Sequence, residues 1–249
     1  MKKIIVANWK CNPASLREAQ RMFLELKQGI GKGGKSEVVV CPPFVYLAEA
    51  AEIFKSGKIK LGGQNCAVTE GGPYTGEISS AMLKNLGAKY VILGHSERRA
   101  LGEDNALINQ KIKIVLKNEL TPIVCLGETA QQKQDNETFL ILEQQVREVL
   151  QKITSAQIGK IILVYEPIWA IGGGQSCPAD TAFSVALFIK KIIAQIANPT
   201  VARRISLLYG GSVDSANAED YLKTEIFSGL LVGGASLKIK EFLKIALLT

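Results

Sequence analysis

The stretch ISLLYGGSVDSANAEDYLKTEIFSGLLVGGAS, residues 205–236, decides the fold of this 249-residue chain. Two β-rich apolar runs, 205–209 and 230–232, each lead into a pair of glycines, at 210–211 and 233–234. Glycine lets the backbone approach a ligand closely, and the N-terminus of a following helix offers unpaired N–H groups to an anion. We therefore predict a phosphate site at the two turns, although tight connections that need positive φ would also contain glycine.

The same alternation of an apolar run and a helical pattern continues outward to both ends of the chain. Eight runs are predicted as strands: Ile4–Ala7, Val38–Cys41, Ile59–Gly62, Tyr90–Leu93, Ile123–Leu126, Ile161–Tyr165, Ile205–Tyr209 and Leu230–Val232. Dividing 249 residues by eight gives about 31 per unit, close to the roughly 30 residues of a strand with its crossover helix. Several runs are almost entirely apolar, as parallel strands covered on both faces should be.

Eight such units can close into a barrel or lie open as a doubly wound sheet. The open sheet usually carries a Gly-x-Gly-x-x-Gly turn after its first strand, whereas this chain has NWKCN at residues 8–12. The length also matches the roughly 250 residues of an eight-stranded barrel. We predict an α/β protein, a (β/α)8 barrel of eight parallel strands surrounded by helices, as a single domain over residues 1–249.

Composition and charge exclude several classes of function. No apolar stretch approaches the roughly 20 residues of a membrane helix, so no membrane partner is predicted. Five widely spaced cysteines without a Cys-x-x-Cys pair indicate a reducing compartment, and we expect the cytoplasm. A single histidine and the lack of an acidic cluster argue against a metal site. The net charge of +7 comes from scattered lysines, which does not indicate a nucleic-acid partner.

Ionisable side chains follow the predicted strands, at the end where barrel enzymes place catalytic groups. Asn8 and Lys10 follow the first strand, His95 and Glu97 the fourth, and Glu166 the sixth. Taken singly, Lys10 could be a surface lysine, His95 a helix cap and Glu166 a solvated carboxylate. Together they predict a catalytic rim.

The segment at about residues 167–178, PIWAIGGGQSCP, combines an apolar tip with three glycines. An exposed apolar tip needs a surface to close on, and closure would exclude water from a reactive intermediate. We predict a lid that grips phosphate. An ordinary buried loop is the alternative.

Five motifs together resemble the triosephosphate isomerase family. They are NWK at 8–10, GHSERR at 94–99, YEPIWAIG at 165–172, YGGSV at 209–213 and LVGGASL at 231–237. Their order and spacing agree over essentially the whole chain. The resemblance implies a TIM barrel that interconverts dihydroxyacetone phosphate and D-glyceraldehyde 3-phosphate through an enediol(ate), in glycolysis and gluconeogenesis, without a cofactor or a metal ion.

The resemblance also implies a role for each matched residue. Glu166 would remove the proton, His95 would donate a hydrogen bond as a neutral imidazole, and Lys10 would supply positive charge. Asn8 would bind substrate beside Lys10, and Glu97, the fourth catalytic candidate, would orient Lys10. Substrate phosphate would be bound through backbone N–H groups of Gly172, Ser212, Gly233 and Gly234.

The family forms a homodimer in which a third loop inserts into the neighbouring subunit. The sequence GPYTGE, residues 72–77, resembles that loop, which implies an interface loop at about 70–78. Thr75 would make the contact, Gln64 leads into the loop, and Cys11 would face the interface from the first loop. Gly173 and residues 175–177 depart from the common lid sequence, which puts lid kinetics rather than activity in question.

Two other functions stay open on the residues alone. One is a different phosphate-binding barrel, such as an aldolase, although a Schiff-base aldolase needs a lysine inside the barrel and the predicted strands offer no well-placed one. The other is a basic protein that binds RNA or an anionic surface without catalysis. A coupled assay for triose phosphate conversion separates the three.

Overall fold

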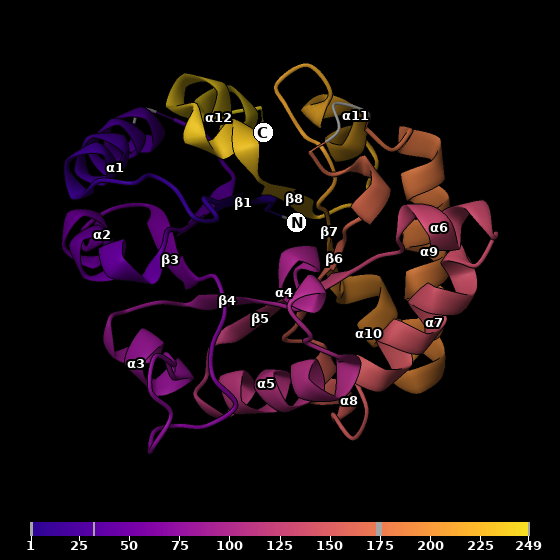
Figure 1. The fold of residues 1–249 in the computed structure, drawn as a ribbon. Helices are drawn as coiled ribbons and strands as arrows, with labels where there is room; N and C mark the ends of the chain where they lie inside the picture. The colour runs from indigo at the N-terminus through magenta and orange to yellow at the C-terminus, as the bar shows by residue number, and fades with distance from the viewer. Residues whose placement is uncertain (1, 32, 173–175, 249) are drawn as a thin grey trace.

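A closed barrel of eight parallel strands, paired in chain order, forms the centre of the computed structural model (Figure 1). The structure describes residues 2–31, 33–172 and 176–248, so residues 173–175 of the predicted lid lie outside the described residues. The strands are β1 (Ile4–Asn8), β2 (Glu37–Cys41), β3 (Ile59–Gly63), β4 (Tyr90–Leu93), β5 (Thr121–Leu126), β6 (Ile162–Tyr165), β7 (Ser206–Tyr209) and β8 (Gly229–Val232).

Helices surround the barrel (Figure 1). Their bounds are α1 (Leu16–Gly31), α2 (Leu47–Phe54), α3 (Ser80–Asn85), α4 (Ser96–Ala100), α5 (Asn105–Lys117), α6 (Ala130–Gln134), α7 (Thr138–Val149), α8 (Ser155–Ile158), α9 (Ala179–Ile196), α10 (Pro199–Arg204), α11 (Ala218–Lys223) and α12 (Ile239–Ala246). Short 3-10 helices are η1 (Phe44–Tyr46), η2 (Ile168–Ala170) and η3 (Gly234–Leu237). Within the described ranges, no helix is long and apolar enough to span a bilayer.

The predicted (β/α)8 barrel and its eight strands are confirmed, with small shifts at the strand ends. Ile161 and Ile205 precede their strands, whereas Gly229 begins β8 and Asn8 ends β1. Both isoleucines are nevertheless buried, at 1% exposure. Apolar character therefore marked burial correctly there but not the residue at which strand pairing begins.

Alternate side chains of each strand point into the barrel or outward beneath the helices. Val6 and Val164 belong to the cluster inside the barrel, while their neighbours Ile5 and Leu163 belong to the layer between strands and helices. All four are buried. Because both faces of each strand are covered, the runs read as continuous apolar segments without polar alternation.

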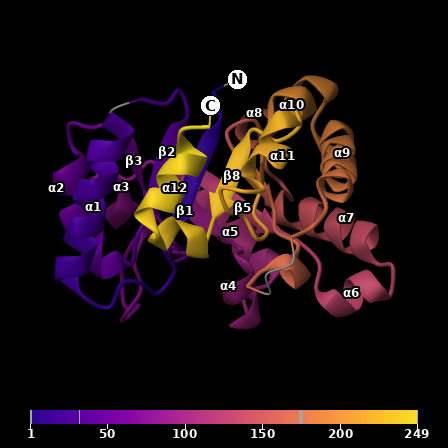
Figure 2. The ribbon, with the colours of Figure 1, turned by 90° about the horizontal axis from the view of Figure 1, so that it is seen from above.

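The parallel direction of the strands places their carboxyl ends at one end of the barrel. Both chain termini lie at one end of the molecule, and α4, which directly follows β4, lies at the other (Figure 2). The residues predicted for catalysis therefore meet at the end that carries α4, although they are far apart in the chain.

Barrel closure depends on glycine at position 229, where β8 pairs with β1. A Cβ atom on Gly229 would lie 1.8 Å from the carbonyl oxygen of Ile4. We expect Gly229→Ala to lower the free energy of unfolding by about 3 kcal/mol or more, because backbone rather than a flexible side chain is in the way. Urea denaturation measures this change.

Gly31→Ala is the matched control, because a Cβ atom at Gly31 would meet nothing within 4 Å. It ends α1, where alanine should be neutral or slightly stabilising. Equal stability of the Gly229→Ala and Gly31→Ala variants would contradict the steric account of closure.

Candidate active site

A cavity of about 320 Å3 opens at the carboxyl ends of the strands. It is lined by Asn8, Lys10, His95, Glu166, Gly172, Gly211, Ser212, Gly233 and Gly234, among others. A larger hollow of about 440 Å3 lies outside the barrel beside α2 and β3. Its ionisable residues, Glu52, Lys55, Lys60 and Lys89, do not follow the carboxyl end of any strand, so the smaller cavity is the candidate active site.

Glu166 follows β6 and is 2% exposed. Its carboxylate accepts hydrogen bonds from the backbone N–H of Ser96 at 3.0 Å and from the Ser96 hydroxyl at 3.1 Å. The Nε2 atom of His95 lies 2.9 Å from Glu166 Oε1. The backbone is fixed as well, because Glu166 N donates to Leu126 O at 2.7 Å. A Cβ atom on Gly127 would lie 1.9 Å from Glu166 O, so the close approach of the loops after β5 and β6 requires glycine there.

His95 is the N-cap of α4, as one of the two sequence interpretations held, and it also faces Glu166. Its Nδ1 atom accepts a hydrogen bond from the Glu97 backbone N–H at 3.2 Å. An accepting Nδ1 carries no proton, so a neutral ring carries its proton on Nε2, the atom that faces the cavity. The helix cap therefore selects the tautomer that can donate a hydrogen bond to a substrate.

Arg99 supports the turn that carries His95. Its Nε donates to Gly94 O at 2.8 Å and its Nη2 to Cys125 O at 3.2 Å. Burial lowers the pKa of Arg99, and the nearby Cys125 and Glu166 oppose that shift. Arg99 thus places a half-buried positive charge near Glu166 while it fixes the loops after β4 and β5.

Lys10 has a left-handed backbone, with φ of 53°. Its N–H donates to Asn8 Oδ1 at 3.2 Å, and its carbonyl accepts from Gln64 Nε2 at 2.9 Å. Its ammonium group pairs with Glu97 Oε1 at 2.7 Å. Gln64, which we predicted at the interface, therefore also holds the backbone of a predicted catalytic residue.

Glu97 does not line the 320 Å3 cavity but a neighbouring hollow that it shares with Lys10. Its side chain is 58% exposed. Its contact with Lys10 is the one the sequence implied. Glu97 therefore contacts the lysine but does not line the cavity that holds Glu166.

The predicted phosphate-binding residues all line the cavity. A Cβ atom on Gly233 would lie 3.5 Å from Cε of Lys10, so the lysine chain extends along this glycine turn. The Ser212 N–H donates to Ala170 O at 2.9 Å. The glycine turn after β7 is therefore hydrogen-bonded to the segment after β6.

Cys11 and Thr75, two of the three predicted interface residues, are exposed, and Gln64 is half-buried. The exposed pair lies outside the cavity.

Sequence reasoning missed Glu128, a carboxylate 1% exposed. It accepts hydrogen bonds from Trp169 Nε1 at 2.7 Å and from the Tyr165 hydroxyl at 3.1 Å. Burial, together with the charge of Glu128, raises the pKa of Tyr165, which keeps this phenol protonated. Glu128 ties the start of the predicted lid to β5. It comes two residues after that strand, so inspection of every strand end would have found it.

Ser96 was quoted within a motif but given no role, although it donates two hydrogen bonds to Glu166. The sequence feature that could have indicated this role is the position of Ser96 at the start of α4, one residue after His95.

The single histidine makes the tautomer directly measurable. We expect 15N NMR to show that the neutral form of the His95 ring has its proton on Nε2, because Nδ1 accepts from Glu97 N. A proton on Nδ1 of the neutral ring would contradict the capping geometry.

The buried acid–base pair of Glu166 and His95, facing glycine turns at the carboxyl end of the barrel, defines a (β/α)8-barrel enzyme of the acid–base class. The chain belongs to the triosephosphate isomerase family, because the family model described as triosephosphate isomerase matches residues 3–248.

Relatives and a solved structure agree over nearly the full length. The triosephosphate isomerase of Endomicrobium trichonymphae is 41% identical, over 98% of this chain and 97% of that protein. That of Dictyoglomus thermophilum is 42% identical, over 97% of each. The crystal structure of triosephosphate isomerase from Bartonella henselae is similar with a TM-score of 0.88 and 34% identity, over 98% of each chain.

Proposed function

We propose that this chain interconverts dihydroxyacetone phosphate and D-glyceraldehyde 3-phosphate through an enediol(ate), as a glycolytic and gluconeogenic isomerase. The observation that carries the proposal is the 2.9 Å approach of His95 Nε2 to the buried Glu166 carboxylate, in a cavity that also contains Lys10 and two glycine turns. The hydrogen removed from one carbon returns to its neighbour, so the reaction needs no external oxidant and no cofactor.

Glu166 acts as the general base. A proton beside a carbonyl is weakly acidic, so the carboxylate must be held close to the carbon while charge on oxygen is stabilised. In the structure, Ser96 donates two hydrogen bonds to the Glu166 carboxylate, and His95 Nε2 lies within hydrogen-bond distance of it. Its side chain therefore exchanges the Ser96 contacts for the substrate carbon when substrate binds, while its backbone stays fixed by Leu126.

His95 and Lys10 stabilise the developing oxyanion. The Nε2–H of neutral His95 donates to the substrate oxygens, and a neutral donor can exchange protons with an enediolate of similar basicity. Lys10 adds fixed positive charge, Asn8 hydrogen-bonds beside it, and Glu97 positions its ammonium group.

Gly172, Ser212, Gly233 and Gly234 bind the phosphate through backbone N–H groups. The Ser212 N–H now donates to Ala170 O, so phosphate competes with that contact. Phosphate binding would thereby release the start of the segment at about 167–178 to move as a lid. The energy of this non-reacting group can then organise the base.

Glu166→Gln tests the base. We expect kcat to fall roughly 10²- to 10⁴-fold, the usual contribution of general base catalysis, because an amide cannot take the proton. Binding of a non-reacting phosphorylated analogue should stay within about tenfold, since the amide keeps the size of the side chain. Steady-state kinetics and calorimetry measure the two quantities.

Glu52→Gln, on the exposed face of α2, is the control for removal of a carboxylate. It should leave kcat unchanged. Near-normal turnover of Glu166→Gln would overturn the assignment of the base.

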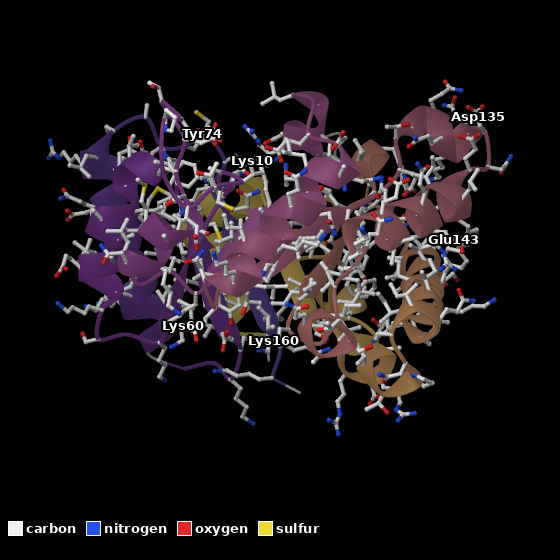
Figure 3. The ribbon with its side chains drawn as sticks, turned by 90° about the horizontal axis from the view of Figure 1, so that it is seen from below. Lys10, Lys60, Tyr74, Asp135, Glu143 and Lys160 are labelled. Atoms are coloured by element: carbon white, nitrogen blue, oxygen red, sulfur yellow. The ribbon has the colours of Figure 1, made fainter. Side chains whose placement is uncertain are left out.

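We also propose that the chain acts as one barrel domain in a cytoplasmic homodimer. Its five cysteines are free, which supports a reducing compartment. Val45, Tyr74 and Met82 are large apolar side chains that are 80%, 51% and 52% exposed. Tyr74, in the loop at about 70–78, lies at the same end of the molecule as Lys10 (Figure 3). Tyr74 precedes Thr75 in this loop, and its exposed apolar side chain supports an interface there, to which Gln64 and Cys11 of the first loop would contribute.

Cys11 allows a test of the dimer, because it is exposed and the other four cysteines are buried. We expect alkylation of Cys11 in dilute protein to convert dimers to monomers in sedimentation and to lower activity, since the neighbouring Lys10 belongs to the site. The Cys11→Ser variant, treated in the same way, should not change. Unchanged sedimentation after stoichiometric modification would refute the placement of Cys11 at the interface.

A further inference from the structure

Cys177 is held on both sides by two buried tyrosines. Its backbone N–H donates to the Tyr209 hydroxyl at 3.2 Å, and its carbonyl accepts from the Tyr221 hydroxyl at 2.6 Å. Cys177, Tyr209 and Tyr221 are each 2% exposed or less. This residue lies directly before Pro178 and α9, at the end of the lid segment opposite Gly172.

The two tyrosines also contact each other. Their rings stack with centroids 3.8 Å apart and planes 13° apart. Burial raises the pKa of Tyr209, and the neighbouring Tyr221 adds to this shift, so the Tyr209 hydroxyl keeps its proton. The two stacked tyrosines thus bond to the N–H and to the carbonyl of the same residue, Cys177.

Tyr209 belongs to the strand that leads into the glycine turn after β7. It ends β7, and its ring lies against the turn that follows. The contact is so close that a Cβ atom on Gly211 would lie 2.2 Å from the Tyr209 hydroxyl oxygen. Gly211 and Ser212 of that turn line the cavity. Tyr221, by contrast, lies on α11, and neither it nor any other residue of α11 lines the cavity.

We infer that Tyr221 is a positioning residue that fixes the α9 end of the lid segment through the Cys177 carbonyl and thereby favours binding of the substrate phosphate. The inference rests on the function proposed above. With Cys177 held, the α9 end of the lid segment has less freedom to lose when the phosphate binds, so the ordering cost of binding is lower. Tyr209 alone holds only the N–H side of Cys177.

Tyr221→Phe removes the hydroxyl and keeps the stacked ring. Loss of one neutral hydrogen bond corresponds to roughly a 2- to 10-fold change in binding. We expect KM for D-glyceraldehyde 3-phosphate to rise by about that factor, with a smaller change in kcat. The value of kcat/KM for D-glyceraldehyde, which lacks the phosphate, should stay within about twofold, since nothing in that substrate draws on the lid.

Tyr90→Phe is the matched control, because the Tyr90 hydroxyl bonds Glu37 at the opposite end of the barrel. It should leave both substrates unaffected, and both variants should keep one cooperative thermal transition. An unchanged KM in Tyr221→Phe, or an equal loss of kcat/KM with both substrates, would overturn the inference. If the wild-type chain itself failed to convert triose phosphates, the proposed function and not the role of Tyr221 would be refuted.

Discussion

Closure of the barrel at the β8–β1 seam is the constraint on which the rest of the structure depends. Ile4 and Gly229 meet there so closely that only hydrogen can occupy the α-carbon of residue 229 on that side. Once the strands close in parallel, the loops after β1, β4, β6, β7 and β8 surround one axis. A site assembled from residues as distant as Asn8 and Gly234 follows from that geometry without any single local motif.

Within the site, three polar groups each bond to a neighbouring residue. The Glu166 carboxylate is bonded by Ser96, the Lys10 ammonium by Glu97, and the Ser212 N–H by Ala170. The Ser96 contacts satisfy the Glu166 carboxylate, which is 2% exposed and would otherwise be costly to bury. The Glu97 contact restrains the more exposed ammonium group of Lys10.

The strands and the rim residues could be predicted from the sequence because their causes are local. A run such as Ile162–Tyr165 is apolar since both of its faces are covered, and Glu166 follows it directly. The contacts that tune the site could not be predicted in this way. Gln64 reaches the Lys10 carbonyl across 54 positions, and Trp169 reaches Glu128 across 41. Such pairings depend on strand register and loop path, which hydrophobic periodicity does not encode.

Lys10 has a left-handed backbone conformation, which lowers the stability of the folded chain at the position of the proposed catalytic cation. The β-carbon makes this conformation less favourable by roughly 1–2 kcal/mol, and glycine, which has none, would relieve it. Selection for thermal tolerance alone would therefore drift toward glycine or asparagine here and remove the cation. A stabilised redesign that keeps the cation proposed for the site should therefore leave residue 10 untouched.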